Sequence, residues 1–139
     1  MPKKSTHQRR KPTRQELRDL DLEISFLEGL LKRDPSHPEA LQALGDDYTR
    51  RGRFEDGLRI DEKLVRLRPD DPTVQYNLAC SYSLTGQCDL AAEALIAAIN
   101  LGYSEFDWMA KDPDLKNLRD HAEYKKIRAK IRRLQPKEG

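Results

Sequence analysis

Residues 38–71 read PEALQALGDDYTRRGRFEDGLRIDEKLVRLRPDD, and residues 72–105 read PTVQYNLACSYSLTGQCDLAAEALIAAINLGYSE. A shift of 34 residues lays the second stretch on the first and brings like residues together: Pro38 and Pro72, Leu44 and Leu78, Tyr48 and Tyr82, Gly52 and Gly86, and Leu67 and Leu101. A repeat of this length is typical of stacked supersecondary units rather than of one closed globule.

Each unit is predicted to form two helices joined by a short turn. Pro38 suits the first position of a helix, where its missing N–H is no loss. Apolar residues then recur at three- and four-residue steps, which places them on one helix face: Ala40, Leu41, Leu44 and Tyr48. Gly52 is expected to end this helix because glycine readily adopts the left-handed conformation. A second apolar stripe follows, from Phe54 to Leu67. Small residues are expected where the two helix axes approach closely: Gly45, Gly57, Ala79 and Ala91.

These spacings resemble the tetratricopeptide repeat, a helical hairpin of 34 residues. The first unit matches the positions of large, small and proline residues in that family with Leu44, Gly45, Tyr48, Gly57 and Pro69, and the second matches with Leu78, Ala79, Tyr82, Ala91 and Leu95. The sequence departs from the family pattern at Asp61 in the first unit and at Gln75 and Tyr103 in the second. The resemblance implies an all-α fold, a short α-solenoid of antiparallel helical hairpins with repeats at 38–71 and 72–102.

The segments on either side are predicted to cap this array. Thr13 and Glu16 have the spacing of a capping box, and an apolar stripe follows in residues 14–34, which predicts one long helix. A coiled-coil dimer seam is the alternative interpretation of that stripe. Residues 102–127 resemble the terminal segment of many bacterial tetratricopeptide arrays, which implies a C-terminal cap at 104–134 in which Phe106, Trp108 and Leu115 cover the second repeat. For Trp108 the alternative is a ligand anchor. The helical domain is therefore expected at 14–134, between a disordered basic arm (1–13) and a short tail (135–139).

Composition limits the classes of function. Charged residues make up 36% of the chain and the mean hydropathy is −0.88. We find no apolar run of the roughly 20 residues that a membrane helix needs, and no apolar stretch typical of a secretion signal, so we expect a cytoplasmic protein. Cys80 and Cys88 are expected to be buried thiols without a disulfide, and the scattered histidines predict no metal site. No cofactor is expected.

The sequence contains no recognisable catalytic motif. It has no phosphate-binding glycine loop, no nucleophile with a nearby histidine, and no helical His-Glu pair at metal spacing. Its acidic pairs, such as Asp46-Asp47, are predicted at exposed or capping positions, whereas carboxylates tuned for acid–base catalysis need burial or a coupled partner. We therefore expect a protein that is not an enzyme.

The family resemblance implies instead a concave groove, lined by the first helix of each repeat, that binds a partner peptide or helix. Carried over to this sequence, the expected groove residues are Gln42, Asp46, Thr49, Arg50, Thr73, Tyr76, Asn77, Cys80 and Ser83. Asn77 is expected to hold a peptide backbone through its amide, which both donates and accepts. Asp46 would repel a C-terminal carboxylate, so a basic or neutral peptide is predicted as the partner of this adaptor or scaffold.

Charge is unevenly distributed and suggests a second hypothesis. Residues 15–122 hold 13 cations and 22 anions, a net charge of −9, whereas both ends of the chain are basic. The alternative function is therefore association with nucleic acid or a ribonucleoprotein through the termini. Its candidate contact residues are Lys3, Lys4, Arg9, Arg10, Lys11, Lys126, Lys130 and Arg133. The chain is expected to be a monomer or a weak homodimer.

Overall fold

The structure is a computed structural model, and it describes residues 10–135. Within that range every regular element is a helix, which confirms the prediction of an all-α protein. Five long helices come first: α1 (Arg14–Arg33), α2 (Pro38–Arg51), α3 (Phe54–Leu67), α4 (Pro72–Leu84) and α5 (Cys88–Asn100). Four shorter ones follow: α6 (Phe106–Met109), the 3-10 helix η1 (Pro113–Leu115), α7 (Lys116–Arg119) and α8 (Tyr124–Leu134).

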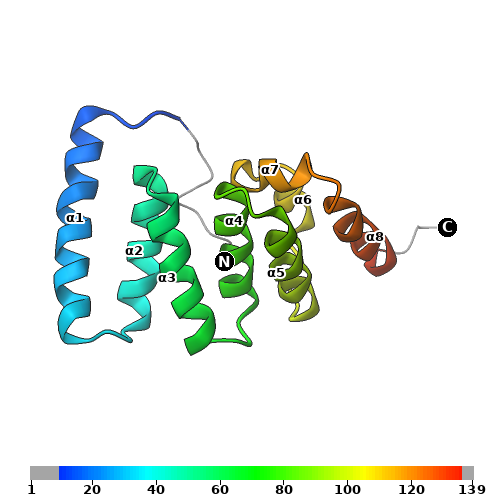
Figure 1. Cartoon of the computed structure of the whole chain (residues 1–139), viewed down its shortest axis with the longest axis horizontal. Helices are drawn as coiled ribbons and strands as arrows, with labels where there is room; N and C mark the ends of the chain where they lie inside the picture. Colours follow the sequence, from blue (N-terminus) through cyan, green and yellow to red (C-terminus); the bar gives the residue numbers. More distant parts are fainter. Residues whose placement is uncertain (1–9, 136–139) are drawn as a thin grey trace.

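The long helices stand side by side in the order of the chain, each packed against the next (Figure 1). The short helices gather around α4 and α5: η1 and α7 contact α4, while α7 and α8 contact α5. The two ends of the described chain therefore lie at opposite ends of the row, with α1 on one side and α8 on the other.

The helix ends follow the expected signals. At the start of α1, the Glu16 N–H donates to Thr13 Oγ1 over 3.1 Å and the Thr13 N–H donates to Glu16 Oε1 over 2.8 Å, so the predicted capping box is present. Pro38 and Pro72 both lie in the first turn of a helix. Gly52 and Gly86 have φ angles of 85° and 79°, in the left-handed region that favours glycine after a helix.

The 34-residue repeat of the sequence recurs in three dimensions. The hydroxyl of Tyr48 on α2 donates to the Glu28 carboxylate on α1. One repeat later, the hydroxyl of Tyr82 on α4 donates to Glu62 Oε2 on α3 over 3.3 Å. In both cases the first helix of a hairpin is tied to the helix that precedes it, so the aligned residues occupy equivalent places.

Small residues lie where α2 and α3 approach each other. A Cβ atom on Gly57 would be 3.2 Å from Thr49 Oγ1 and 3.6 Å from the Gly45 carbonyl oxygen. The equivalent positions in the next hairpin hold Ala79 and Ala91, both fully buried. These contacts confirm the prediction of close helix approach at the small residues.

The largest apolar core lies towards the C-terminal end of the row. It joins residues of α4 and α5 to buried side chains from the segments that follow, including Met109, Leu115, Leu118 and Ile127. Phe106 and Trp108 are half-buried and pack against the same cluster. A smaller core holds α1 against α2 through Ile24, Leu27, Leu44 and other residues. Among residues 10–135, no helix combines the length and apolar character needed to cross a bilayer.

Candidate binding site

The C-terminal segment of the chain lies against α4, on the side where the sequence predicted an open groove. The side chain of Asn117 donates to the Ser83 carbonyl oxygen over 2.9 Å, and the Leu118 N–H donates to Ser83 Oγ over 3.1 Å. Leu115 and Leu118 are completely buried beneath this contact. The chain therefore fills this face of α4 with its own residues 112–118.

A buried polar cluster anchors this segment. The hydroxyl of Tyr76 donates to Asp112 Oδ2 over 2.6 Å, and its ring stacks on Tyr103 with the centroids 4.2 Å apart. Arg119 donates to the Asp112 carbonyl oxygen over 2.8 Å and to that of Met109 over 3.0 Å. Burial raises the pKa of the Tyr76 hydroxyl well above its usual range, and the negative charge of its neighbours raises it further. Tyr76 therefore acts here as a permanent hydrogen-bond donor.

The prediction that the second repeat offers an open groove is consequently wrong. Tyr76, Cys80 and Ser83 have no exposed surface, and Asn77 is only 2% exposed. Because Asn77 is buried, its amide cannot reach a peptide in the present arrangement, although its side-chain oxygen has no hydrogen-bond partner within the described range. The physical reason is the hydrophobic effect. Packing Leu115 and Leu118 against α4 removes their apolar surface from water, and the same segment covers the polar side chains of α4.

Thr49 is a further incorrect assignment. Its hydroxyl donates to the Gly45 carbonyl oxygen over 3.1 Å and its side chain packs against Gly57, so it belongs to the α2–α3 contact. Of the predicted groove residues, Gln42, Asp46 and Thr73 are half-buried and Arg50 is exposed. The face of α2 that carries Gln42, Asp46 and Arg50 is therefore the part of the predicted site that remains accessible; we call it the α2 face.

The contact between α1 and α2 carries an unusual carboxyl pair beside the α2 face. Asp47 is buried, and its Oδ2 atom has no hydrogen-bond partner in the described part of the chain. Burial, reinforced by the Glu23 carboxylate of α1, raises the pKa of Asp47 to about 8, against a weaker opposing effect of Arg50. One repeat later, Ser81 takes this place and donates to Asp61 Oδ2 over 2.5 Å.

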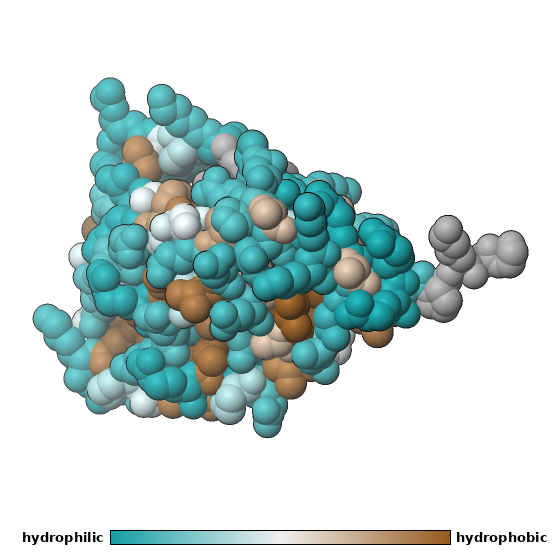
Figure 2. Space-filling model, turned by 45° about the vertical axis from the view of Figure 1, so that its right-hand side comes forward, coloured by the Kyte–Doolittle hydropathy of each residue, from teal (hydrophilic) through white to brown (hydrophobic). Residues whose placement is uncertain are grey.

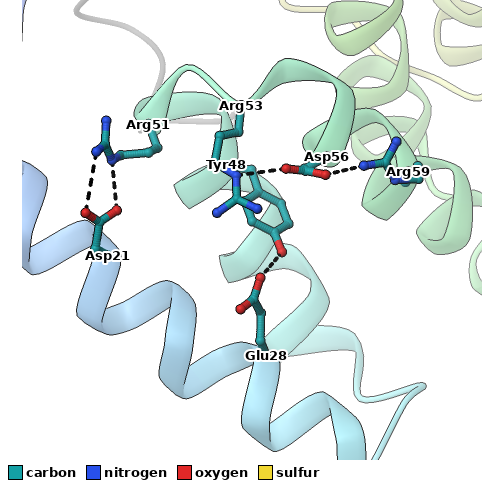
Figure 3. Close-up of polar contacts among 7 residues, drawn as sticks. All are labelled: Asp21, Glu28, Tyr48, Arg51, Arg53, Asp56 and Arg59. Carbon is teal, nitrogen blue, oxygen red and sulfur yellow. Dashed lines mark hydrogen bonds and ion pairs between the residues drawn. The ribbon is translucent and has the colours of Figure 1, made fainter.

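Charged residues also link α1, α2 and α3 at one end of the helices (Figure 3). Arg51 Nε donates to Asp21 Oδ1 on α1 over 2.8 Å. Arg53 lies over the Tyr48 ring, 4.5 Å from its centroid, and is paired with Asp56. Burial and the hydrogen bond to Glu28 raise the pKa of Tyr48 to about 12, so this hydroxyl stays a donor across the physiological range.

The predicted polyanion contacts fall into three groups. Lys3, Lys4 and Arg9 lie outside the described residues. Lys11 is exposed, and so is Arg10, which is paired with Glu16. On α8, Arg133 is exposed, Lys126 is paired with Glu123, and Lys130 is half-buried, which removes it from the outward face.

Comparison with known proteins gives one partial similarity. No protein-family model matches the chain. A chloroplastic protein of Arabidopsis thaliana is 30% identical over 83 residues, which are 58% of this chain and 25% of that protein. The chain thus spans about a quarter of the length of this relative.

Sequence reasoning missed the residues that occupy the face of α4. The contacts that position the segment are made by Asp112, Asn117 and Arg119. All three are residue types that are common on protein surfaces, so nothing in their chemistry marked them out. One signal was present: Asn117 lies 34 residues after Ser83, so a third repeat in the same register would have placed it beside α4. Cys80 and Cys88 are buried and form no disulfide, as expected.

Proposed function

We propose that this chain is a short α-solenoid of the tetratricopeptide type that acts as a protein-interaction adaptor and binds a basic, extended peptide on the α2 face. The recurring hairpins, the repeated tyrosine–glutamate contacts and the close approach at Gly45 and Gly57 support this architecture. In such an array the first helix of each hairpin, here α2 and α4, faces the groove.

The observation that carries the proposal is the occupation of α4 by residues 112–118. This segment meets α4 through a side-chain amide on a main-chain oxygen, a main-chain N–H on a side-chain hydroxyl, and two buried leucines. Residues 113–119 are helical, in η1 and α7, so these are contacts by which a short helical segment packs on a neighbouring helix. Because this half of the groove is already filled, a partner is left with the α2 face.

The charge of the α2 face selects the partner. Asp46 is half-buried there, four residues before the exposed Arg50, and the exposed Glu39, which pairs with Arg68, lies one turn before Gln42. The surrounding residues 15–122 have a net charge of −9. A partially desolvated carboxylate attracts a cation more strongly than an exposed one, because the local dielectric constant is lower. A peptide rich in lysine or arginine therefore fits, and an acidic tail does not.

The proposed activity is binding without turnover. In the described range no three histidine, cysteine or acidic residues form a group that could hold a metal ion. The buried carboxyl groups serve interfaces: Asp112 bonds to Tyr76, and Asp47 lies between α1 and α2. Cytoplasmic residence and a monomeric or weakly dimeric state remain predictions that accompany this proposal.

Fluorescence anisotropy with a labelled peptide of about twelve alternating lysine and alanine residues tests the proposal. The full chain should bind this peptide and should not bind its glutamate–alanine counterpart. Asp46→Asn should weaken binding about fivefold, which corresponds to roughly 1 kcal/mol of lost charge pairing.

Asp70→Asn is the matched control, because it removes the same charge from an exposed position in the turn before α4. Binding should change less than twofold in this variant. Equal losses in the two variants would show that the peptide responds only to the overall charge, and the α2 face would then be discarded as the site.

A further inference from the structure

The last helix, α8, has two faces of opposite character. Tyr124 and Ile127 are buried and Ile131 packs beside them, which fixes the helix to the core next to α5. The other side exposes a row of cations around the small Ala129: Lys125, Lys126, Arg128, Arg132 and Arg133. The end of the molecule that holds α8, on the right in Figure 2, is accordingly mostly hydrophilic.

Most of these cations have no acidic partner. Lys126 is paired with Glu123 over 2.7 Å and also lies near Asp89 and Glu93 of α5. In the part of the chain that the structure describes, the other four form no ion pair: Lys125, Arg128, Arg132 and Arg133. The guanidinium of Arg128 lies 4.8 Å from the centroid of the Tyr124 ring, which holds it in place at the surface. We call these four residues the α8 row.

Helix stability explains only part of the α8 row. Cations in the last turn complement the helix dipole, and Arg132 and Arg133 lie there. Lys125 lies in the first turn, where the dipole favours an anion, and no acidic residue occupies that turn. A cation that opposes the dipole and neutralises no carboxylate is better explained by an anionic partner.

We propose that the α8 row binds the sugar-phosphate backbone of a nucleic-acid duplex. Lys125 and Arg132 are seven residues apart, about 10 Å along the helix, and a duplex strand presents one phosphate per roughly 3.4 Å of its axis. The row therefore spans about three phosphates. It exposes no aromatic side chain for stacking on bases and no amide for reading base edges, so binding is independent of sequence.

A lipid surface fits this helix less well. Amphipathic helices bind membranes by burying their apolar face among the acyl chains. In α8 that face is already occupied, since Tyr124 and Ile127 are packed in the core of the protein. The proposal is also independent of peptide binding on α2, because the two surfaces lie on different helices.

Fluorescence anisotropy of the full chain with a 20-base-pair DNA or RNA duplex at several salt concentrations tests the proposal. The logarithm of the affinity should fall with the logarithm of salt concentration with a slope of about −3. Changing all four α8-row residues to glutamine should lower the affinity at least tenfold at low salt and remove most of the slope. The control variant, with Lys32, Arg33, Arg66 and Lys111 changed to glutamine, loses the same charge from exposed positions and should bind within twofold of the unmodified chain.

Lys125→Glu separates binding from folding. It places an anion in the first turn of α8, so it should raise the melting temperature while it weakens duplex binding severalfold. Unchanged duplex affinity in this variant or in the four-residue variant would overturn the proposal. Loss of binding on removal of residues 1–9 alone would also overturn it, and so would binding to phosphatidylserine vesicles without binding to the duplex.

Discussion

At the scale of single residues, Asp47 shows how the repeat varies. The corresponding residue of the next repeat, Ser81, donates to Asp61, whereas the residue 34 positions before Asp61 is Leu27. A leucine offers no hydrogen bond, so Asp47 is left with the Glu23 carboxylate as its main neighbour on α1. Burial disfavours the ionised form of Asp47, and the nearby Glu23 carboxylate disfavours it further, which together explain the raised pKa of Asp47.

The first prediction concerns the pH dependence that Asp47 causes. Because its pKa is about 8 when folded and near the ordinary value of 3.8 when unfolded, the folded state retains the proton between these values. Its contribution to stability is therefore fully present below about pH 4 and is lost as pH rises towards 8. The groups that face it are Glu23 on α1 and Asp46 and Arg50 on α2.

Asp47→Asn should remove this part of the pH dependence, because the amide cannot ionise. Urea unfolding at pH 5 and pH 9 measures it: the variant should gain stability relative to the unmodified chain at pH 9 and much less at pH 5. Asp70→Asn, at an exposed position, serves as the control and should follow the unmodified chain at both pH values. If Asp47→Asn and the unmodified chain lost the same stability between pH 5 and pH 9, the raised pKa of Asp47 would be contradicted.

The second prediction concerns Ser81, which lies one repeat after Asp47. Ser81→Ala removes the hydroxyl that donates to the buried Asp61 carboxylate. We expect a loss of about 1–3 kcal/mol in the free energy of unfolding, the usual cost of removing one partner of a buried polar group. Ser104→Ala changes an exposed serine and should have an effect below about 0.5 kcal/mol, so equal effects would indicate that the Ser81 contact contributes nothing.

At the scale of elements, the helices and their ends could be predicted from the sequence because their signals are local. Pro38 opens α2 and Gly52 follows its end with a φ of 85°, and both properties belong to the residue itself. The docking of residues 112–118 could not be predicted in this way. Tyr76 and Asn77 occupy repeat positions that were expected to line the groove. Their burial depends on the packing of Leu115 and Leu118 against α4, far along the chain.

The third prediction compares two helical glycines. A Cβ atom on Gly29 of α1 would meet nothing within 4 Å, so Gly29→Ala should stabilise the protein by about 0.5–1 kcal/mol through helix propensity. Gly57→Ala should instead destabilise it by about 1 kcal/mol. Its new methyl group would lie 3.2 Å from Thr49 Oγ1, which is held by its hydrogen bond to Gly45.

Thermal unfolding of the two alanine variants measures this difference directly. Both changes offer the same gain in helix propensity, so only the contact between α2 and α3 distinguishes them. If both variants were stabilised equally, the close approach of these helices would not limit the side chain at position 57.

At the scale of the whole molecule, the C-terminal segment closes one half of the row of helices and leaves the other half accessible. Leu115, Leu118 and Ile127 complete the core around α4 and α5, and the α2 face remains in contact with solvent through Gln42 and Arg50. The acidic body and the basic α8 row then lie on separate surfaces. The two proposed binding surfaces, for a peptide on α2 and for a duplex on α8, therefore lie on different helices.

The fourth prediction tests the role of this segment. Leu118→Ala should cost about 2–5 kcal/mol in the free energy of unfolding, because Leu118 is completely buried. It should also speed the reaction of Cys80 with a thiol reagent, since the segment that covers this residue is loosened. Leu134→Ala is the control: its side chain is 53% exposed, so stability and thiol reactivity should stay nearly unchanged.

The most direct test of the account is an NMR titration of the isotope-labelled full chain with the lysine–alanine peptide. We expect the amide signals of Gln42, Asp46 and Arg50 to shift, while those of Asn77, Ser83 and Asn117 keep their positions because residues 112–118 remain bound to α4. Shifts confined to Asn77, Ser83 and Asn117 would mean that the peptide displaces this segment, and they would contradict the assignment of the binding site to α2.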